Sequence, residues 1–401
     1  MDLRTLLSAL AGSALFLTTT LAPAAAQAPQ PAPQPQPQAA QPALPTPSAP
    51  SLSANSYVLM DFASGNVLAE KNASERVEPA SLTKMMASYL VFKEIAAGRV
   101  QPTDAVTISE KAWKTGGSKM FVEVGKQVPV KDLLMGMVVQ SGNDATVALA
   151  EHLGGTEEVF AQMMNTEAQR LGMHGSHFVN ADGLPDPEHY TTALDMALLS
   201  RALIADFPDH YPSYAVKEFS FNGITQHNRN SLLWRDASID GIKTGHTEAA
   251  GYCLAASAER DGMRLIAVVM GTESEKVRAD EAQALLNYGF RFFESHTLYQ
   301  PGRAIAEPAV WKGAAPTVAL GVTAPVVVTV PRGSYDKLQA SMDVPTQLTA
   351  PIAQGQQVGV VRIALEGKVL AEQPLVALAA VAEGGFFKRM NDEFWMWWEA
   401  D

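Results

Sequence analysis

Two groups of strand-like segments enclose a long helical stretch, and this order limits the possible folds more than any other feature of the chain. "SYVLMDFASGNVLAEKN" reads as a strand, a Ser-Gly-Asn turn and a second strand. "IDGIKTGHT", "GYCLAASAER" and "MRLIAVVMGT" read as three more strands, with Asp261-Gly262 suited to a hairpin turn between the last two. Strands at both ends with helices between them predict one antiparallel sheet flanked by helical layers, an α+β fold.

Helical segments fill the stretch between these strands. A helix is expected to follow Ser81, and another is expected at 279–296, after the last strand. The helical pattern is interrupted at Ser141-Gly142-Asn143, so a short turn is expected there. The other predicted helices cover 130–140, 144–155, 156–173 and 191–207.

The chain divides into five predicted parts. Residues 1–26 read as a signal peptide, 27–50 as a disordered linker and 51–297 as the α+β domain. Segments in 298–383 are short, β-rich and separated by Gly, Pro and Asp, which predicts a small all-β domain. Residues 384–401 are predicted to form an amphipathic helix.

The N-terminus is typical of exported proteins. Arg4 precedes an apolar stretch, and small residues favour cleavage after Ala26. A retained membrane anchor is the alternative, although the apolar run is short and broken by threonines. The linker is rich in Pro, Gln and Ala and carries no charge, so it cannot form a core. The single cysteine, Cys253, permits no internal disulfide and reads as a small core residue.

Composition and spacing disfavour several classes of ligand. The formal net charge is -12, whereas nucleic-acid binders carry a basic balance or patch, so no nucleic acid is expected as a partner. His174 and His177 have the spacing of a metal-ligand pair, but in a predicted loop they read as exposed or capping side chains. The glycines of "GGSKMF" do not precede a strand-to-helix phosphate loop. We therefore expect no metal and no cofactor.

Ser81 and Lys84 stand three residues apart in "EPASLTKMMASYL", where a helix is expected to begin. Positions i and i+3 share one face of a helix. A serine hydroxyl becomes a strong nucleophile when a neighbour takes its proton, and a lysine can do so if desolvation and a nearby cation such as Lys243 lower its pKa. Ser81 could instead be a simple helix cap.

Two further motifs favour the chemical interpretation. Ser141, in "SGN", can relay a proton toward a leaving amine, and Asn143 can bind a substrate amide. "KTG", formed by Lys243, Thr244 and Gly245, falls on a predicted strand along whose edge an extended peptide can lie. Acyl transfer needs a nucleophile and a route for protons, and these motifs can supply both.

The backbone supplies the expected oxyanion hole. The N–H groups of Ser81 and His246 are predicted to point at the developing negative charge. Thr244 and a cationic group are expected to receive a substrate carboxylate.

The motifs resemble those of serine penicillin-binding proteins and class A β-lactamases. "QHNRNSLLWRD…DGIKTGHTEAAGYCLAASAERDGMRLIAVVMG", "KMFVEVGKQVPVKDLLMGMVVQSGNDATVALAEHLGG" and "LLNYGFRFFE" are similar to low-molecular-weight penicillin-binding proteins of the D-alanyl-D-alanine carboxypeptidase type. The resemblance runs from about Ser53 to the C-terminus. It implies a β-lactamase/transpeptidase-like domain followed by the β domain.

The resemblance also implies an activity and a set of site residues. The enzyme would remove the terminal D-alanine from peptidoglycan pentapeptide stems through an acyl-enzyme, and β-lactams would inhibit it covalently. Arg278 would be the cation at the substrate carboxylate, and His246 matches the "KTGH" form found in part of the family. The residues carried over are Ser81, Lys84, Ser141, Asn143, Lys243, Thr244, Gly245, His246, Arg229 and Arg278.

Two alternatives stay open. A DD-endopeptidase acting on peptidoglycan cross-links would use the same chemistry, and an inactive wall-binding scaffold would take up no labelled penicillin. A β-lactamase is disfavoured because no Glu-x-x-Leu-Asn pattern lies between Asn143 and Lys243 and because a second domain follows.

The C-terminal "EGGFFKRMNDEFWMWWEAD" is too short and too charged to cross a bilayer. It suits a helix lying in the interface of a membrane, and the family resemblance implies such an anchor on the outer face of the cytoplasmic membrane. A core-packed or partner-binding helix is the alternative. One face contains Phe386, Phe387, Met390, Phe394, Trp397 and Trp398, and the opposite side contains Lys388, Arg389, Asp392, Glu393 and Glu399.

Overall fold

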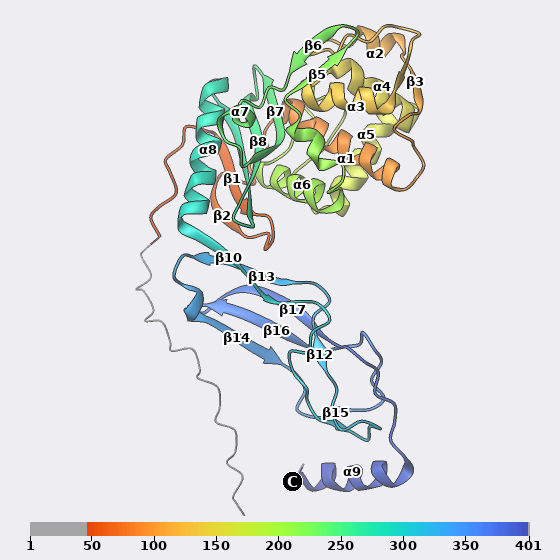
Figure 1. Cartoon of the computed structure of the whole chain (residues 1–401), viewed down its shortest axis with the longest axis vertical. Helices are drawn as coiled ribbons and strands as arrows, with labels where there is room; N and C mark the ends of the chain where they lie inside the picture. The colour runs from red at the N-terminus through yellow and green to blue at the C-terminus, as the bar shows by residue number, and fades with distance from the viewer. Residues whose placement is uncertain (1–45, 400–401) are drawn as a thin grey trace, which may run out of the picture. The chain divides into compact units, whose positions relative to one another are not determined.

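The computed structural model describes residues 46–399, so the predicted signal peptide and residues 27–45 of the predicted linker lie outside the described residues. A five-stranded antiparallel sheet with the order β2-β1-β9-β8-β7 confirms the expected pairing of distant strands (Figure 1). Asp261 and Gly262 turn β8 into β9 as predicted. The strands are β1 (Ser56–Asp61), β2 (Val67–Lys71), β7 (Ile239–Thr247), β8 (Gly251–Arg260) and β9 (Met263–Thr272).

Both faces of this sheet are apolar because helices cover both. Alternate residues of a strand point to opposite faces. In β1, Val58 and Met60 join one buried cluster, whereas Tyr57 and Leu59 join the other. The second cluster lies under α8 (Glu275–Phe292), which Figure 1 shows on the side of the sheet opposite α1 (Thr83–Ala96) and α6 (Ala193–Asp206). The sheet is therefore the middle layer of three.

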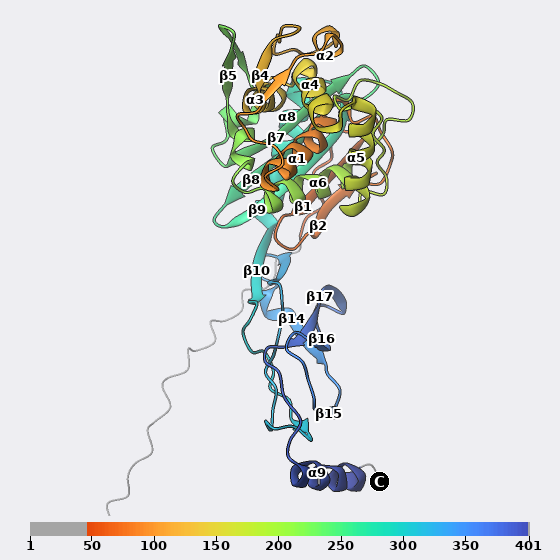
Figure 2. The ribbon, with the colours of Figure 1, turned by 90° about the vertical axis from the view of Figure 1, so that its right-hand side faces the viewer.

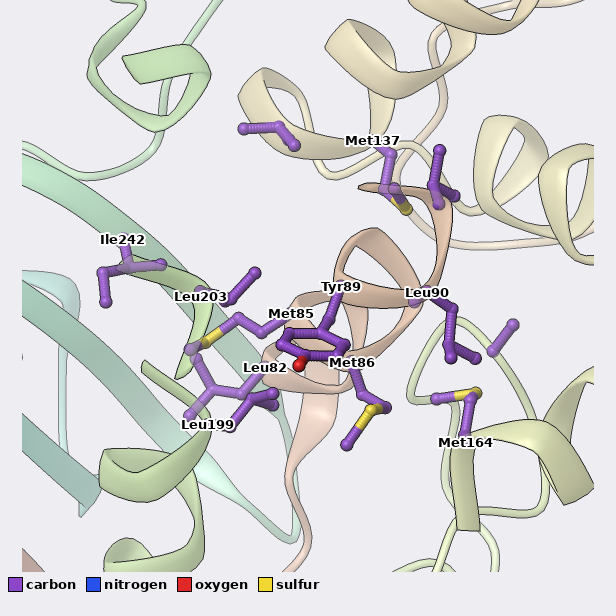
Figure 3. Close-up of a cluster of buried hydrophobic side chains, with 14 of the residues drawn as sticks. Leu82, Met85, Met86, Tyr89, Leu90, Met137, Met164, Leu199, Leu203 and Ile242 are labelled. Carbon is purple, nitrogen blue, oxygen red and sulfur yellow. The ribbon is translucent and has the colours of Figure 1, made fainter. Parts of the chain in front are cut away.

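The larger core surrounds α1, whose apolar residues face several other helices (Figures 2 and 3). Met85, Met86 and Tyr89 are at most 1% exposed. Thr156 and Thr192 begin two of the helices by accepting hydrogen bonds from Val159 N and Asp195 N through their side chains. The helices of this layer are α1 (Thr83–Ala96), α2 (Glu110–Lys114), α3 (Val130–Val139), α4 (Asn143–Gly154), α5 (Glu157–Arg170) and α6 (Ala193–Asp206). The short helix α7 (Leu232–Arg235) packs Leu232 and Leu233 into the other cluster, with α8.

The helix predicted at 279–296 exists, but both of its predicted ends are wrong. The side chain of Ser274 accepts a hydrogen bond from Val277 N and so begins α8 four residues earlier than expected. The helix stops at Phe292 because 293–299 pair with another strand instead. The antiparallel pair β3 (Ala105–Thr107) and β4 (Gln127–Pro129) and the hairpin β5–β6 (Glu218–Phe221, Ile224–His227) were not predicted.

The C-terminal part is rich in β structure, as predicted. Its largest sheet has four strands in the order β12-β17-β16-β14, and β10 pairs with β13. The predicted domain boundary at 297/298 stays a prediction. The elements are β10 (Phe293–Tyr299), β11 (Val310–Trp311), β12 (Leu320–Gly321), β13 (Val326–Pro331), β14 (Leu338–Asp343), β15 (Leu348–Thr349), β16 (Gln357–Leu365), β17 (Lys368–Ala377) and α9 (Phe386–Glu399).

The terminal helix α9 contacts the rest of the chain through its polar side. Asp392 is 3% exposed and accepts a hydrogen bond of 2.7 Å from Lys312 N. Phe387 and Trp397 are 81% and 63% exposed. None of the helices in residues 46–399 is both long and apolar enough to cross a membrane.

Candidate active site

Ser81 lies in a single 3-10 turn, η1 (Ala80–Leu82), that leads directly into α1. The expected helix therefore begins two residues after Ser81, but the turn still brings Ser81 and Lys84 together. Ala80 has a φ of 47°, in the left-handed region that residues with a Cβ seldom adopt. Such a conformation just before a reactive side chain is a known mark of functional sites.

Lys84 is buried, and its ammonium is aimed at Ser81. Nζ lies 2.9 Å from Ser81 Oγ and 2.5 Å from the backbone oxygen of Asp182. Desolvation is the main cause that lowers the Lys84 pKa to about 8, and the charge of Arg229 lowers it further, whereas Asp182 raises it. Arg229 is thus one cation that acts with desolvation on Lys84, and Lys243, the cation named from the sequence, is close enough to repel Lys84.

Ser141 and Lys243 form a second pair of a hydroxyl and a lysine at the cavity. Ser141 lies between α3 and α4 with a φ of 66°. Lys243 Nζ donates to Ser141 Oγ at 2.9 Å and to the Thr244 backbone oxygen at 3.0 Å. Desolvation, followed by the charges of Lys84 and Arg229, lowers the Lys243 pKa well below its usual value. A lysine in this environment can give up or share a proton readily.

Asn143 lies beneath the cavity, where it supports a loop. Its side chain is buried and donates to the Gly116 backbone oxygen at 2.7 Å. Asp144 accepts hydrogen bonds from the backbone N–H groups of residues 120–122 and holds the same loop. The structure therefore places Gly117 and Ser118 at the cavity and Asn143 behind them.

Gly245 brings the edge strand β7 close to the nucleophile. A Cβ at Gly245 would lie 3.1 Å from Pro79 O and 3.2 Å from Ser81 N. These distances are tighter than ordinary contact and involve backbone atoms. Only glycine lets the strand approach the Ser81 N–H group this closely.

A cavity of about 430 Å³ opens above these groups. Seven of the ten predicted residues line it, and Lys84, Asn143 and Lys243 lie beneath its floor. Sequence reasoning missed four lining residues: Gly117, Ser118, Tyr252 and Glu275. It considered the glycines of "GGSKMF" only as a phosphate loop. The lining residues are Ser81, Gly117, Ser118, Ser141, Arg229, Thr244, Gly245, His246, Tyr252, Glu275 and Arg278.

Arg278 is a buried guanidinium at one wall of the cavity. It is 3% exposed, donates to the Gly245 backbone oxygen at 3.3 Å and lies 3.4 Å from Glu275. Its guanidinium carbon is 5.5 Å from the centre of the Tyr252 ring, and Tyr252 stacks on His246 with 3.9 Å between ring centres. The wall is thus cationic and rigid, which suits a carboxylate ligand.

Sequence reasoning also missed the loop that carries Asp182. Gly183, the residue after Asp182, has a φ of 84°, and a Cβ at Gly183 would come within 1.9 Å of Ala80 O. This close packing holds the Asp182 oxygen against Lys84. The described residues, 46–399, contain no group of His, Cys, Asp and Glu side chains arranged to hold a metal ion, and Cys253 is buried in β8.

Family models match two consecutive parts of the chain. Residues 44–274 match a D-alanyl-D-alanine carboxypeptidase model, and residues 293–383 match the C-terminal domain of penicillin-binding protein 5. The chain is 46% identical to D-alanyl-D-alanine carboxypeptidase DacC of Escherichia coli over 355 residues, which are 86% of this chain and 89% of the relative.

Solved structures agree with this match. Penicillin-binding protein 5 of Haemophilus influenzae superposes with a TM-score of 0.81 at 43% identity and covers 84% of this chain and 99% of that one. The ampicillin-bound form of penicillin-binding protein D2 of Listeria monocytogenes has a TM-score of 0.56 at 30% identity and covers 60% of this chain and 98% of that one. The chain belongs to the D-alanyl-D-alanine carboxypeptidase family of penicillin-binding proteins.

Proposed function

We propose that this protein is a serine D-alanyl-D-alanine carboxypeptidase that removes the terminal D-alanine from peptidoglycan stem peptides. The observation that carries the proposal is the buried Lys84 ammonium, 2.9 Å from the Oγ of a serine that faces the cavity. In this mechanism Ser81 attacks the carbonyl carbon of the penultimate D-alanine. The peptide C–N bond breaks, D-alanine leaves, and water then hydrolyses the ester.

Lys84 is the general base for this attack. A neutral lysine has one lone pair, which can take the Ser81 proton while an N–H group stays bonded to the Asp182 oxygen. With a pKa of about 8, about one Lys84 in ten is neutral at pH 7. At the ordinary pKa of 10.5 that fraction would be about one in 3,000.

Ser141 and Lys243 handle the proton of the leaving amine. Ser141 Oγ lines the cavity and accepts a hydrogen bond from Lys243, so it can pass a proton to the amine and be resupplied by the lysine. The N–H groups of Ser81 and His246 are the proposed oxyanion donors, which the close approach at Gly245 supports.

The cationic wall of the cavity binds the substrate carboxylate in this proposal. Thr244, Arg229 and Arg278 line the cavity together, and a guanidinium can bind a carboxylate through two hydrogen bonds. A peptide that ends in a free carboxylate is therefore the preferred substrate. β-Lactams carry a carboxylate next to a reactive amide and would acylate Ser81 in the same way.

We also propose that the mature protein is exported and moored by α9 to the outer face of the cytoplasmic membrane. Phe386, Phe387, Met390 and Trp397 are more than half exposed, and the polar side of α9 faces the β domain through Asp392. These exposures support an interfacial helix over a core-packed one.

The activity is tested with a soluble pentapeptide that ends in D-alanyl-D-alanine. Mass spectrometry is expected to show loss of one alanine by the purified protein and none by Ser81→Ala. A matched peptide ending in D-alanyl-L-alanine is expected to stay intact. Cleavage by Ser81→Ala, or no cleavage by the unmodified protein, contradicts the proposal.

A further inference from the structure

A cavity of about 340 Å³ is lined by α9 together with Lys312 and Ala350 of the β-rich part. We propose that it binds the head group of a membrane phospholipid that carries both a phosphate and a primary amine. The inference rests on the anchor proposed above, because it needs α9 at the membrane surface. It adds a specific lipid ligand to an anchor that otherwise depends on the burial of apolar side chains.

The backbone of Lys312 fixes the position of α9 beside the cavity. Its N–H group donates to Asp392 at 2.7 Å, and its carbonyl oxygen accepts a hydrogen bond from Gly384 N at 2.8 Å. The buried carboxylate of Asp392 also accepts a hydrogen bond of 2.6 Å from Lys388. The helix is therefore held just before its first residue and again in its second turn, so the cavity has a defined shape.

One face of α9 forms a wall of the cavity. The residues of the helix that line the cavity follow the i, i+3, i+4, i+7 spacing of a single face, and they are Phe386, Arg389, Met390 and Glu393. Phe386 and Met390 are also 63% and 55% exposed, so the cavity borders the apolar surface of the helix. An interfacial helix buries its apolar side about 5–10 Å into the boundary between head groups and acyl chains. The charged part of the cavity is therefore expected at the depth of the lipid head groups.

Two cations and two carboxylates make up the charged lining of the cavity, so its formal charge is zero. Arg389 lies 2.7 Å from Glu383, and Lys312 Nζ lies 3.5 Å from Glu393. The side chains of Arg389 and Glu383 are 43% and 50% exposed, and ion pairs between such side chains contribute little stability. A ligand that offers both a negative and a positive group can therefore replace these pairings at low cost.

A phosphate and a primary amine in one head group complement this lining. The Arg389 guanidinium can bind a phosphate through two hydrogen bonds, and the Lys312 ammonium adds a further donor. The ammonium of the ligand has three N–H donors for the carboxylates of Glu383 and Glu393. A quaternary amine has no N–H donor, and an anionic lipid without an amine would place its negative charge beside both carboxylates. The lining therefore favours the zwitterion with a primary amine.

Vesicle flotation with the purified protein measures this preference. The vesicles contain phosphatidylcholine alone, or phosphatidylcholine mixed with equal parts of phosphatidylethanolamine or phosphatidylglycerol. We expect binding to the phosphatidylethanolamine vesicles to be about tenfold tighter than to either of the others, the effect of a charged hydrogen bond. Lys312→Gln combined with Arg389→Gln should remove this gain. The matched control is Lys337→Gln combined with Arg362→Gln, which removes two cations from ion pairs outside the cavity and should keep the gain.

The other outcomes separate the lipid site from the anchor. Equal binding to all three kinds of vesicle, or a gain that survives Lys312→Gln with Arg389→Gln, overturns the lipid site and keeps the anchor. A protein that binds no vesicle contradicts the anchor and the lipid site with it.

Soluble competitors identify the source of the phosphate. Glycerophosphoethanolamine is expected to lower binding to the phosphatidylethanolamine vesicles, and inorganic phosphate at the same concentration is not. Equal competition by both would show a general phosphate site in which the amine has no part, and this result would overturn the inference. Penicillin labelling and thermal unfolding check that each variant is folded.

Discussion

Acylation of Ser81 is expected to depend on pH through Lys84. Its pKa, lowered to about 8 mainly by burial, makes the neutral base scarce below that pH and abundant above it. The neutral fraction rises from about one in ten at pH 7 to about nine in ten at pH 9, close to a tenfold increase. The acylation rate by a labelled penicillin should follow the same curve and level off above pH 9.

Substitution of the lysine tests the same point independently. Arg keeps a positive charge but does not lose its proton in this pH range. Lys84→Arg is therefore expected to slow acylation by about 10²- to 10⁴-fold, the usual cost of removing a general base. Lys93→Arg makes the same change on the same helix at a side chain that is 41% exposed, and it should label normally. A flat profile from pH 6 to 9, or near-normal labelling of Lys84→Arg, would refute the assignment.

Three further outcomes are expected. Gly245→Ala should slow acylation, because the new Cβ would lie only 3.2 Å from Ser81 N. The control Gly385→Ala should not slow it, because a Cβ there meets no atom within 4 Å. Stopped-flow labelling with a penicillin compares the two acylation rates. Arg229→Gln should lower kcat/KM about tenfold for a peptide with a free C-terminal carboxylate, as the loss of a charged hydrogen bond predicts, and should leave the peptide amide unaffected. Deleting residues 386–401 should release the protein from membranes and leave its labelling by penicillin intact. High salt alone should not release the full chain. If the shortened protein still pellets with membranes, α9 is not the anchor.

The sequence predicted the sheet and the reactive pair because both follow local rules. Alternating strands and the i, i+3 spacing of Ser81 and Lys84 depend on neighbours in the chain, and the family resemblance supplied Arg229 and Arg278. The structure adds what depends on distant contacts. The oxygen of Asp182, 98 positions from Lys84, meets its ammonium only after folding. No local pattern indicates such a contact.

Tertiary pairing also explains the misplaced helix end. "FRFFESH" continues the helical pattern of α8, but 293–299 form β10 because β13 offers a partner for their backbone groups. The contact that Asn143 makes could not be predicted for a similar reason. Its bond to the Gly116 oxygen depends on a loop that folds over it, and its role in binding a substrate amide stays a prediction.

Mapping the penicillin adduct is the sharpest test of Ser81 as the acylated nucleophile. The purified protein is labelled with a penicillin, digested and analysed by tandem mass spectrometry beside Ser81→Ala. Ser81 faces the cavity and is the hydroxyl that Lys84 contacts at 2.9 Å. We expect one adduct, on Ser81, and none in the folded Ser81→Ala variant. An adduct on any other residue, or labelling of Ser81→Ala, would contradict this assignment.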